Sequence, residues 1–102
     1  MKTEKSLEDQ KKIIEMLEAN GYRHLKLLDT GELAAIMPQL FTVGLFVGLK
    51  RYGYRTRFCF ATMEDAKESL RNWTGVNDPP GNWIKEKGRI ERMNPRYEKG
   101  RQ

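Results

Sequence analysis

Residues 41–61, FTVGLFVGLKRYGYRTRFCFA, predict a long β-hairpin around which the rest of the chain is organised. Hydrophobic residues recur at every second position of residues 41–49, which is the period of a strand with one buried face. Residues 54–61 alternate in the same way, with aromatic residues on one face and arginines on the other, and residues 50–53 supply the turn. Because an isolated hairpin is only marginally stable in water, we expect further strands and a helix to pack against it.

The flanking sequence predicts two helices and two more strands. An apolar stripe ends at Asn20-Gly21, a strong helix stop signal, and Thr62 is a good N-cap for a second helix. Turn residues at 29–31 separate two short segments that read as strands. The predicted elements are a helix at 6–20, strands at 22–28, 33–37, 41–49 and 54–61, and a helix at 63–73.

These elements predict an α+β fold in a single domain over residues 1–97: a helix, a four-strand antiparallel meander and a second helix. The strands are expected to be antiparallel because parallel neighbours need longer connections. Residues 74–97 are predicted to be an irregular basic loop, and residues 98–102 a flexible tail. We expect both helices to cover the sheet face that bears Phe58 and Phe60.

The composition describes a small basic protein. The chain has 102 residues and a formal net charge of +5, which suits nucleic acid or an acidic protein surface as a partner. A single cysteine, Cys59, excludes an intrachain disulfide and a cysteine metal cluster. The longest apolar stretch is too short to span a bilayer and the amino terminus does not read as a secretory signal, so we predict a cytoplasmic protein without a membrane partner.

The sequence does not assemble a catalytic constellation. His24 is the only histidine, so a histidine-based triad or metal site would depend on that residue alone. No glycine-rich phosphate loop joins a strand to a helix. We therefore predict a non-enzymatic protein with no cofactor and no metal, and an enzyme of unknown type is the less favoured alternative.

One candidate binding surface is a basic face of the sheet. The residues predicted to form it are Arg55 and Arg57, with Lys50 and Arg51 at the adjoining turn, and with His24 and Lys26 if the register of the first strand permits. Together with an aromatic residue such as Phe46, this face could hold single-stranded nucleic acid by phosphate contacts and stacking. The alternative is that these cations only keep surface strands soluble and prevent edge pairing.

A second candidate surface is residues 78–87, DPPGNWIKEK. Two prolines stiffen this segment, and it presents Trp83 beside Lys85 and Lys87. Tryptophan is common at interface hot spots, so the segment could anchor a protein partner. The alternative is that Trp83 folds back and closes one end of the hydrophobic core.

Residues 53–88, GYRTRFCFATMEDAKESLRNWTGVNDPPGNWIKEKG, resemble a pattern found in short proteins of phages and prophages. The pattern consists of Trp73 and Gly75, an Asp-Pro-Pro-Gly turn at 78–81, and Trp-Ile-Lys at 83–85. The resemblance implies a small accessory protein that acts by binding, for example as an inhibitor of a host defence complex. It assigns a functional role to no individual residue.

We therefore predict stoichiometric binding to a host protein or ribonucleoprotein through Arg55, Arg57 and the Trp83 segment. Direct nucleic-acid binding by the same basic face is the alternative. An exposed strand edge could also pair two copies into a homodimer.

Overall fold

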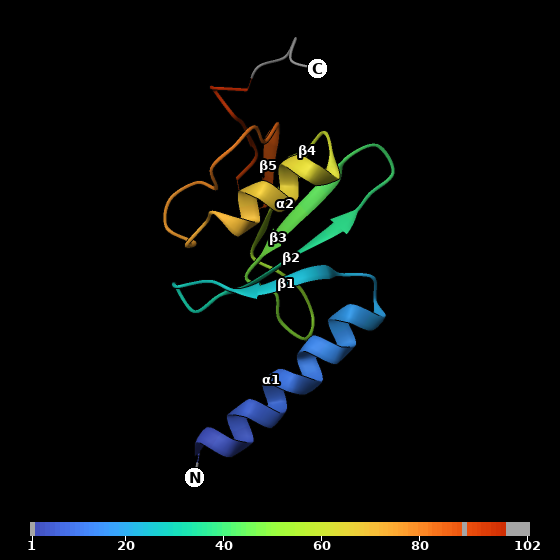
Figure 1. The fold of residues 1–102 in the computed structure, drawn as a ribbon, viewed down its shortest axis with the longest axis vertical. Coiled ribbons are helices and arrows are strands. Elements are labelled where there is room, and N and C mark those ends of the chain that lie inside the picture. The colour runs from blue at the N-terminus through green and yellow to red at the C-terminus, as the bar shows by residue number, and fades with distance from the viewer. Residues whose placement is uncertain (1, 89, 98–102) are drawn as a thin grey trace.

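The computed structural model describes residues 2–88 and 90–97, with side chains described from residue 9 onward, so the predicted tail at 98–102 lies outside the described residues. Two helices and six strands follow one another along the chain (Figure 1). They are α1 (Lys2–Ala19), β1 (Arg23–Leu27), β2 (Leu33–Pro38), β3 (Val43–Val47), β4 (Thr56–Phe60), α2 (Met63–Arg71), β5 (Lys85–Gly88) and β6 (Arg92–Met93).

The strands form one antiparallel sheet in the order β1-β2-β3-β4-β5-β6. The predicted α+β fold and meander are confirmed, with two strands more than expected. β5 and β6 lie in residues 74–97, which were predicted to be a loop. The β5 sequence, KEKG, has no hydrophobic alternation from which a strand could be predicted. β5 pairs with β4 through backbone hydrogen bonds and does not need a buried apolar face.

α2 covers one face of the sheet, as predicted. Its N-cap is Thr62, whose hydroxyl accepts a hydrogen bond from the Asp65 backbone N–H at 3.1 Å. The helix buries its apolar stripe against β2, β3 and β4. The buried residues of this main core are Leu28, Ala34, Ile36, Val43, Leu45, Val47, Phe58, Phe60, Ala66, Leu70, Trp73 and Trp83.

α1 packs on the opposite face, so the expectation that both helices share one face was wrong. Leu17 is buried there with Ala35, Phe46 and Leu49, and Ile13 packs beside them. The reason is that the sheet is apolar on both faces at β2 and β3, where Ala34 to Ile36 are completely buried. α1 lies diagonally against this second core and its N-terminal half projects away from the sheet (Figure 1).

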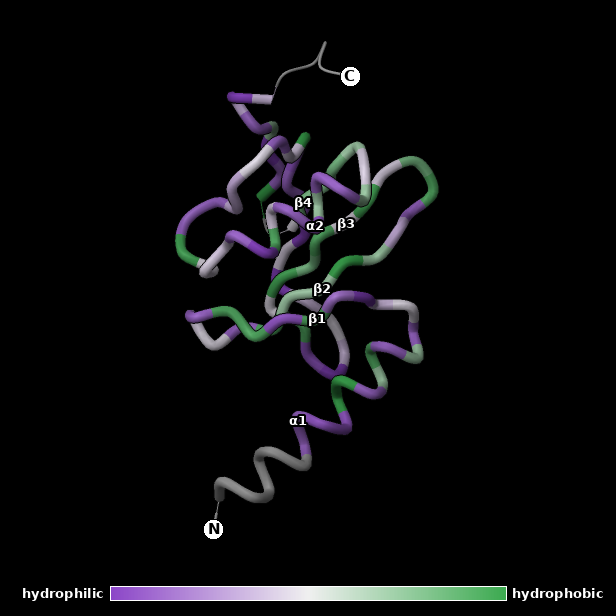
Figure 2. Tube along the Cα trace, viewed as in Figure 1, coloured by the Kyte–Doolittle hydropathy of each residue, from purple (hydrophilic) through white to green (hydrophobic). Residues whose placement is uncertain are grey.

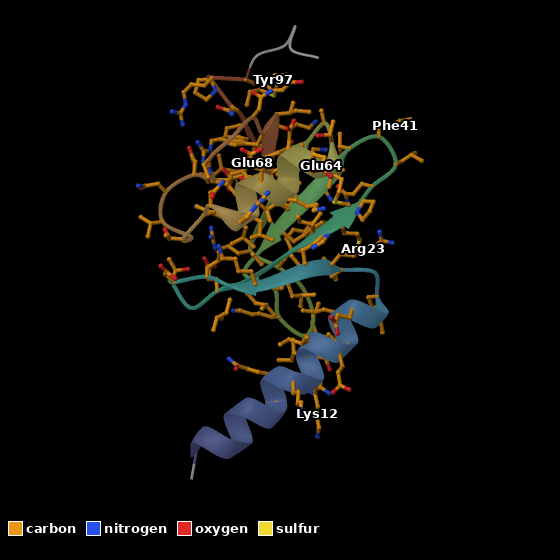
Figure 3. The ribbon with its side chains drawn as sticks, in the orientation of Figure 1. Lys12, Arg23, Phe41, Glu64, Glu68 and Tyr97 are labelled. Carbon is orange, nitrogen blue, oxygen red and sulfur yellow. The ribbon has the colours of Figure 1, made fainter. Side chains whose placement is uncertain are left out.

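The alternation of β3 ends at Gly48, which has a φ of +74°. This left-handed conformation turns Leu49 toward the α1 side, whereas Val47 faces α2. Phe41, predicted to begin the strand, instead lies before β3 and is 87% exposed at the tip of the β2–β3 loop (Figure 3). The predicted strand at 41–49 is therefore shorter at both ends.

The segment after α2 folds back over the main core. Trp83 is 1% exposed and its ring meets Phe58 edge to face at 5.0 Å. Arg92 lies over the Trp83 ring, and the Asn94 side chain donates a hydrogen bond to the Trp83 carbonyl at 2.8 Å. Hydrophobic residues concentrate along the central strands, and hydrophilic ones are frequent along the coloured part of α1 (Figure 2). Within the described residues, neither helix has the length and apolarity needed to span a membrane.

Candidate functional site

The structure separates the seven predicted binding residues into three places. Lys50, Arg51 and Arg55 lie at a groove beside α1, Arg57, Lys85 and Lys87 lie on the sheet face, and Trp83 lies in the main core. The burial of Trp83 rules out its side chain as an exposed anchor in this structure and supports the alternative that it completes the core.

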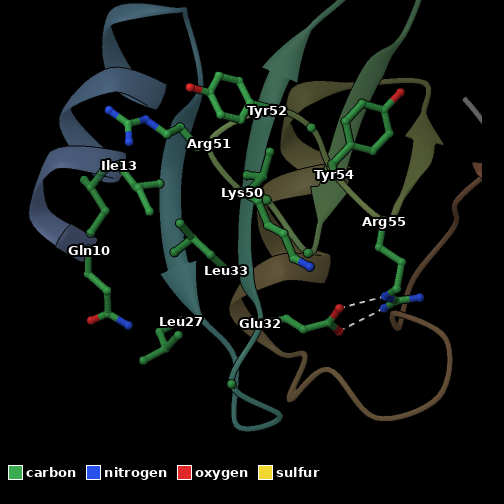
Figure 4. A pocket seen from close by; sticks show the side chains of 15 residues that line it. Gln10, Ile13, Leu27, Glu32, Leu33, Lys50, Arg51, Tyr52, Tyr54 and Arg55 are labelled. Carbon is green, nitrogen blue, oxygen red and sulfur yellow. Dashed lines mark hydrogen bonds and ion pairs between the residues drawn. The ribbon is translucent and has the colours of Figure 1, made fainter. Parts of the chain in front are cut away.

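The groove, with a volume of about 810 Å³, runs between α1 and the turn that joins β3 to β4 (Figure 4). Its α1 wall is formed by Ile13, Ile14 and Gln10. Ile13 packs against the second core beside Leu17 and also borders the groove, and Ile14 follows it on the same wall. The other apolar lining residues are Leu27, Leu33 and Leu49.

The far wall is the turn at residues 50–54, KRYGY. The turn is closed by a hydrogen bond of 2.8 Å from the Lys50 backbone N–H to the Gly53 carbonyl. Tyr52 is 91% exposed and Tyr54 is 41% exposed, so both rings border the groove while facing solvent. Arg51 places its guanidinium 5.9 Å from the centre of the Tyr52 ring.

An ion pair between Glu32 and Arg55 lies at the end of the groove away from Tyr52 (Figure 4). Arg55 donates two hydrogen bonds to the Glu32 carboxylate, at 2.7 and 2.9 Å. The hydrogen bond from Arg55 lowers the pKa of Glu32, with burial opposing the shift and the charge of Lys50 adding to it. Glu32 is the one acid among the described lining residues, so the groove presents an uncompensated positive rim.

The Glu32–Arg55 ion pair packs closely against the backbone of Gly48. A Cβ at Gly48 would lie 2.7 Å from the Arg55 Cβ and 2.9 Å from a Glu32 carboxylate oxygen. The absence of a side chain at Gly48 therefore leaves the space that Arg55 and Glu32 occupy. At Gly44 a Cβ would lie 2.7 Å from the Phe46 ring.

Phe46 is the centre of an aromatic cluster next to the groove. Its ring meets Tyr22 at 5.2 Å and Tyr54 at 4.7 Å, both edge to face, and the Arg57 guanidinium lies 5.9 Å from its centre. Burial raises the pKa of Tyr22, with Tyr54 adding to the shift and the charge of Arg57 opposing it. Phe46 is 3% exposed, so the predicted stacking of a nucleobase on this ring was wrong.

Lys26 does not join the basic face. Its ammonium donates hydrogen bonds to the carbonyls of Leu70, Arg71 and Trp73, at 2.8, 3.2 and 2.8 Å, on the α2 side of the sheet. Lys26 therefore completes the C-terminal end of α2. His24 lies in an irregular part of β1, where its φ is +56°.

Sequence reasoning missed the α1 wall and the two tyrosines of the groove. The pattern that indicated the two tyrosines was present in the turn KRYGY, which places two aromatic residues around a glycine where turns are usually polar.

Among the described residues, no cluster of three or more histidine, cysteine, aspartate or glutamate side chains could hold a metal ion.

The chain was compared with protein-family models, with curated proteins and with solved structures, and none of the three comparisons gave a match.

Proposed function

We propose that this protein acts by stoichiometric binding, and that the groove between α1 and the β3–β4 turn receives a segment of a partner protein carrying both apolar and acidic side chains. The observation that supports this proposal best is the combination of an apolar floor with exposed tyrosines and a positive rim at one site.

The apolar lining favours a partner that buries hydrophobic side chains. Ile13, Ile14 and Leu33 lie along the groove, and Leu27 is 58% exposed at its border. An exposed apolar surface rimmed by polar groups is typical of protein interaction sites. Tyrosine and arginine are enriched at interface hot spots, and the turn supplies both.

The charges of the rim favour acidic residues in the same partner segment. Lys50 and Arg51 form no ion pair among the described residues, and Glu32 is already neutralised by Arg55. Electrostatic complementarity increases association rates and selects among partners. The formal net charge of +5 acts in the same direction.

The exposure of the site to solvent favours a macromolecule over a small ligand. Small-molecule pockets usually enclose most of their ligand. Here Tyr52 is 91% exposed and stands at the rim, where it can cover only one side of an occupant. The resemblance of residues 53–88 to phage-type proteins supports a host protein, alone or within a ribonucleoprotein, as the partner.

Selection from a displayed library of random peptides tests the proposal. We expect the enriched peptides to place aspartate or glutamate next to aliphatic or aromatic residues. Their affinity should fall about tenfold or more for Lys50→Gln/Arg51→Gln, which corresponds to about 1.4 kcal/mol of binding free energy.

The matched control is Lys67→Gln/Arg71→Gln, which removes the same charge from α2 on the other side of the sheet. Failure of the library to yield binders would contradict the proposal, as would enriched peptides without acidic residues. Equal loss of affinity in the two double variants would show that net charge alone was responsible.

A further inference from the structure

We infer that a second surface, made by Arg57, Lys85 and Lys87, binds the phosphate backbone of single-stranded nucleic acid. We call these three residues the cationic strip. None of these three cations lines the groove, so this inference goes beyond the proposed function, although Tyr54 borders both surfaces.

The sheet register brings the three cations together on the face opposite α2. Arg57 lies directly across from Lys87, and Cys59 directly across from Lys85, on the paired strands β4 and β5. Directly paired residues of an antiparallel sheet point to the same face. Lys85 and Lys87 are two positions apart along the strand, or roughly 7 Å, a spacing comparable to that of neighbouring phosphates along a nucleic acid strand.

α1 does not cover the cationic strip. The second core, which α1 helps to form, contains residues of β1, β2 and β3 and ends at Phe46. Arg57, Lys85 and Lys87 are each partly exposed. The three cations can therefore be reached from solvent, although Cys59 on the same face is buried.

The three positive charges are not compensated within the described residues. None of them takes part in an ion pair there. Glu86, which lies between the two lysines in sequence, points to the other face, where it accepts hydrogen bonds from Thr56 and Arg92. Like charges directly opposite one another destabilise a sheet, so a polyanion that neutralises Arg57 and Lys87 would relieve a repulsion that is built into the fold.

Arg57 is held in position before any ligand binds. Its guanidinium packs over Phe46 at 5.9 Å, and its buried Nε has no hydrogen-bond partner among the described residues. A cation fixed in this way loses little conformational freedom on binding. Tyr54, which touches Phe46 at 4.7 Å and is 41% exposed, offers a ring on which an unpaired base can stack. Stacking of this kind favours a single strand over a duplex.

Fluorescence anisotropy tests the inference. The labelled ligands are single-stranded DNA and RNA oligonucleotides and a duplex of the same sequence. The salt concentration is varied between about 50 and about 200 mM, because each phosphate contact adds roughly 0.7 to the slope of log affinity against log salt for a single strand. Lys85→Gln/Lys87→Gln should make the slope shallower by about 1.4, while the α2 control Lys67→Gln/Arg71→Gln should leave it unchanged.

Three results would overturn the inference: no binding of any oligonucleotide at the lowest salt, the same change of slope in both double variants, or tighter binding of the duplex than of the single strand. The groove variant Lys50→Gln/Arg51→Gln separates this site from the proposed function. We expect it to lose the selected peptides and to retain the difference in slope caused by Lys85→Gln/Lys87→Gln.

Discussion

At the scale of single residues, Gly48 determines how the groove is built. Its φ of +74° ends the alternation of β3, turns Leu49 toward α1 and leaves room for the Glu32–Arg55 ion pair. Glycine is the residue that adopts this conformation without a steric penalty. The shape of the groove therefore depends on a residue that has no side chain.

Gly48→Ala should destabilise the protein by about 1–3 kcal/mol. The new methyl group would clash with Arg55, and alanine rarely adopts the left-handed backbone conformation of this position. Urea unfolding followed by circular dichroism measures the effect. Gly31→Ala is the matched control, since Gly31 also has a positive φ, of +93°, but has open space where a Cβ would lie. Equal losses in the two variants would contradict the role given to the close approach.

Trp83 is a core residue, and its removal should be costly. Trp83→Ala should lower the free energy of unfolding by about 3–5 kcal/mol, because it leaves a cavity beside Phe58. Trp83→Phe should cost much less, since the Trp83 indole nitrogen has no hydrogen-bond partner among the described residues. Thermal unfolding of both variants checks this, and a stable Trp83→Ala protein would contradict the core assignment.

At the scale of elements, α2 is held to the sheet by more than its apolar stripe. Lys26 reaches across from β1 and donates to three carbonyls at the C-terminal end of the helix. Positive charge at this end also interacts favourably with the helix dipole.

Lys26→Met keeps the aliphatic stem and removes the ammonium, so we expect a loss of about 1–3 kcal/mol from the broken charged hydrogen bonds. Lys67→Met, at a partly exposed position of α2 with a long 3.7 Å ion pair to Glu64, is the control and should change stability by less than about 0.5 kcal/mol. Amide hydrogen exchange should show faster exchange near residues 70–73 in Lys26→Met. Unchanged protection there would contradict the capping role.

The ion pair between Glu32 and Arg55 connects the residue before β4 to the residue before β2, and it makes stability depend on pH. Because Arg55 lowers the pKa of Glu32 below its ordinary value of 4.5, the pair stabilises the fold above that value and loses its effect as the pH falls through the lowered pKa. The pair is partly exposed, so we expect wild type to exceed Glu32→Gln by only about 0.2–1 kcal/mol at neutral pH. Unfolding measured from pH 7 down to acid should show this difference disappearing, and a difference that stays constant would contradict the assignment.

The elements also show what the sequence could and could not predict. The strands β3 and β4 followed from strong alternation and the helix α2 from a good N-cap at Thr62, while β1 and β2 followed from the turn residues between them. β5 and β6 were missed because pairing at a polar sheet edge leaves no hydrophobic period. The sheet face on which α1 packs could not be predicted. Ala35 and Phe46 make the second face of the sheet apolar, and the apolar stripe of α1 could pack on either face.

At the scale of the whole molecule, the two helices lie on opposite faces of one sheet, and this arrangement separates the predicted basic surface into two. Arg55 belongs to the groove and Arg57 to the cationic strip, although they are only two positions apart in sequence. The kink at Gly48 and the position of α1 are long-range consequences of folding that residue spacing does not reveal. Pairing of two copies through a strand edge stays a prediction, and the irregular β1 and the two-residue β6 are features that usually discourage it.

The most direct test of the central claim is a map of backbone amide shifts in the ¹⁵N-labelled protein during titration with a peptide selected from the random library. The proposed function predicts that the largest changes fall on Ile13, Ile14, Leu33 and residues 50–54, and that α2 and β5 change little. Changes centred on α2, or on β5 with none at residues 50–54, would contradict the groove as the site where this protein binds its partner.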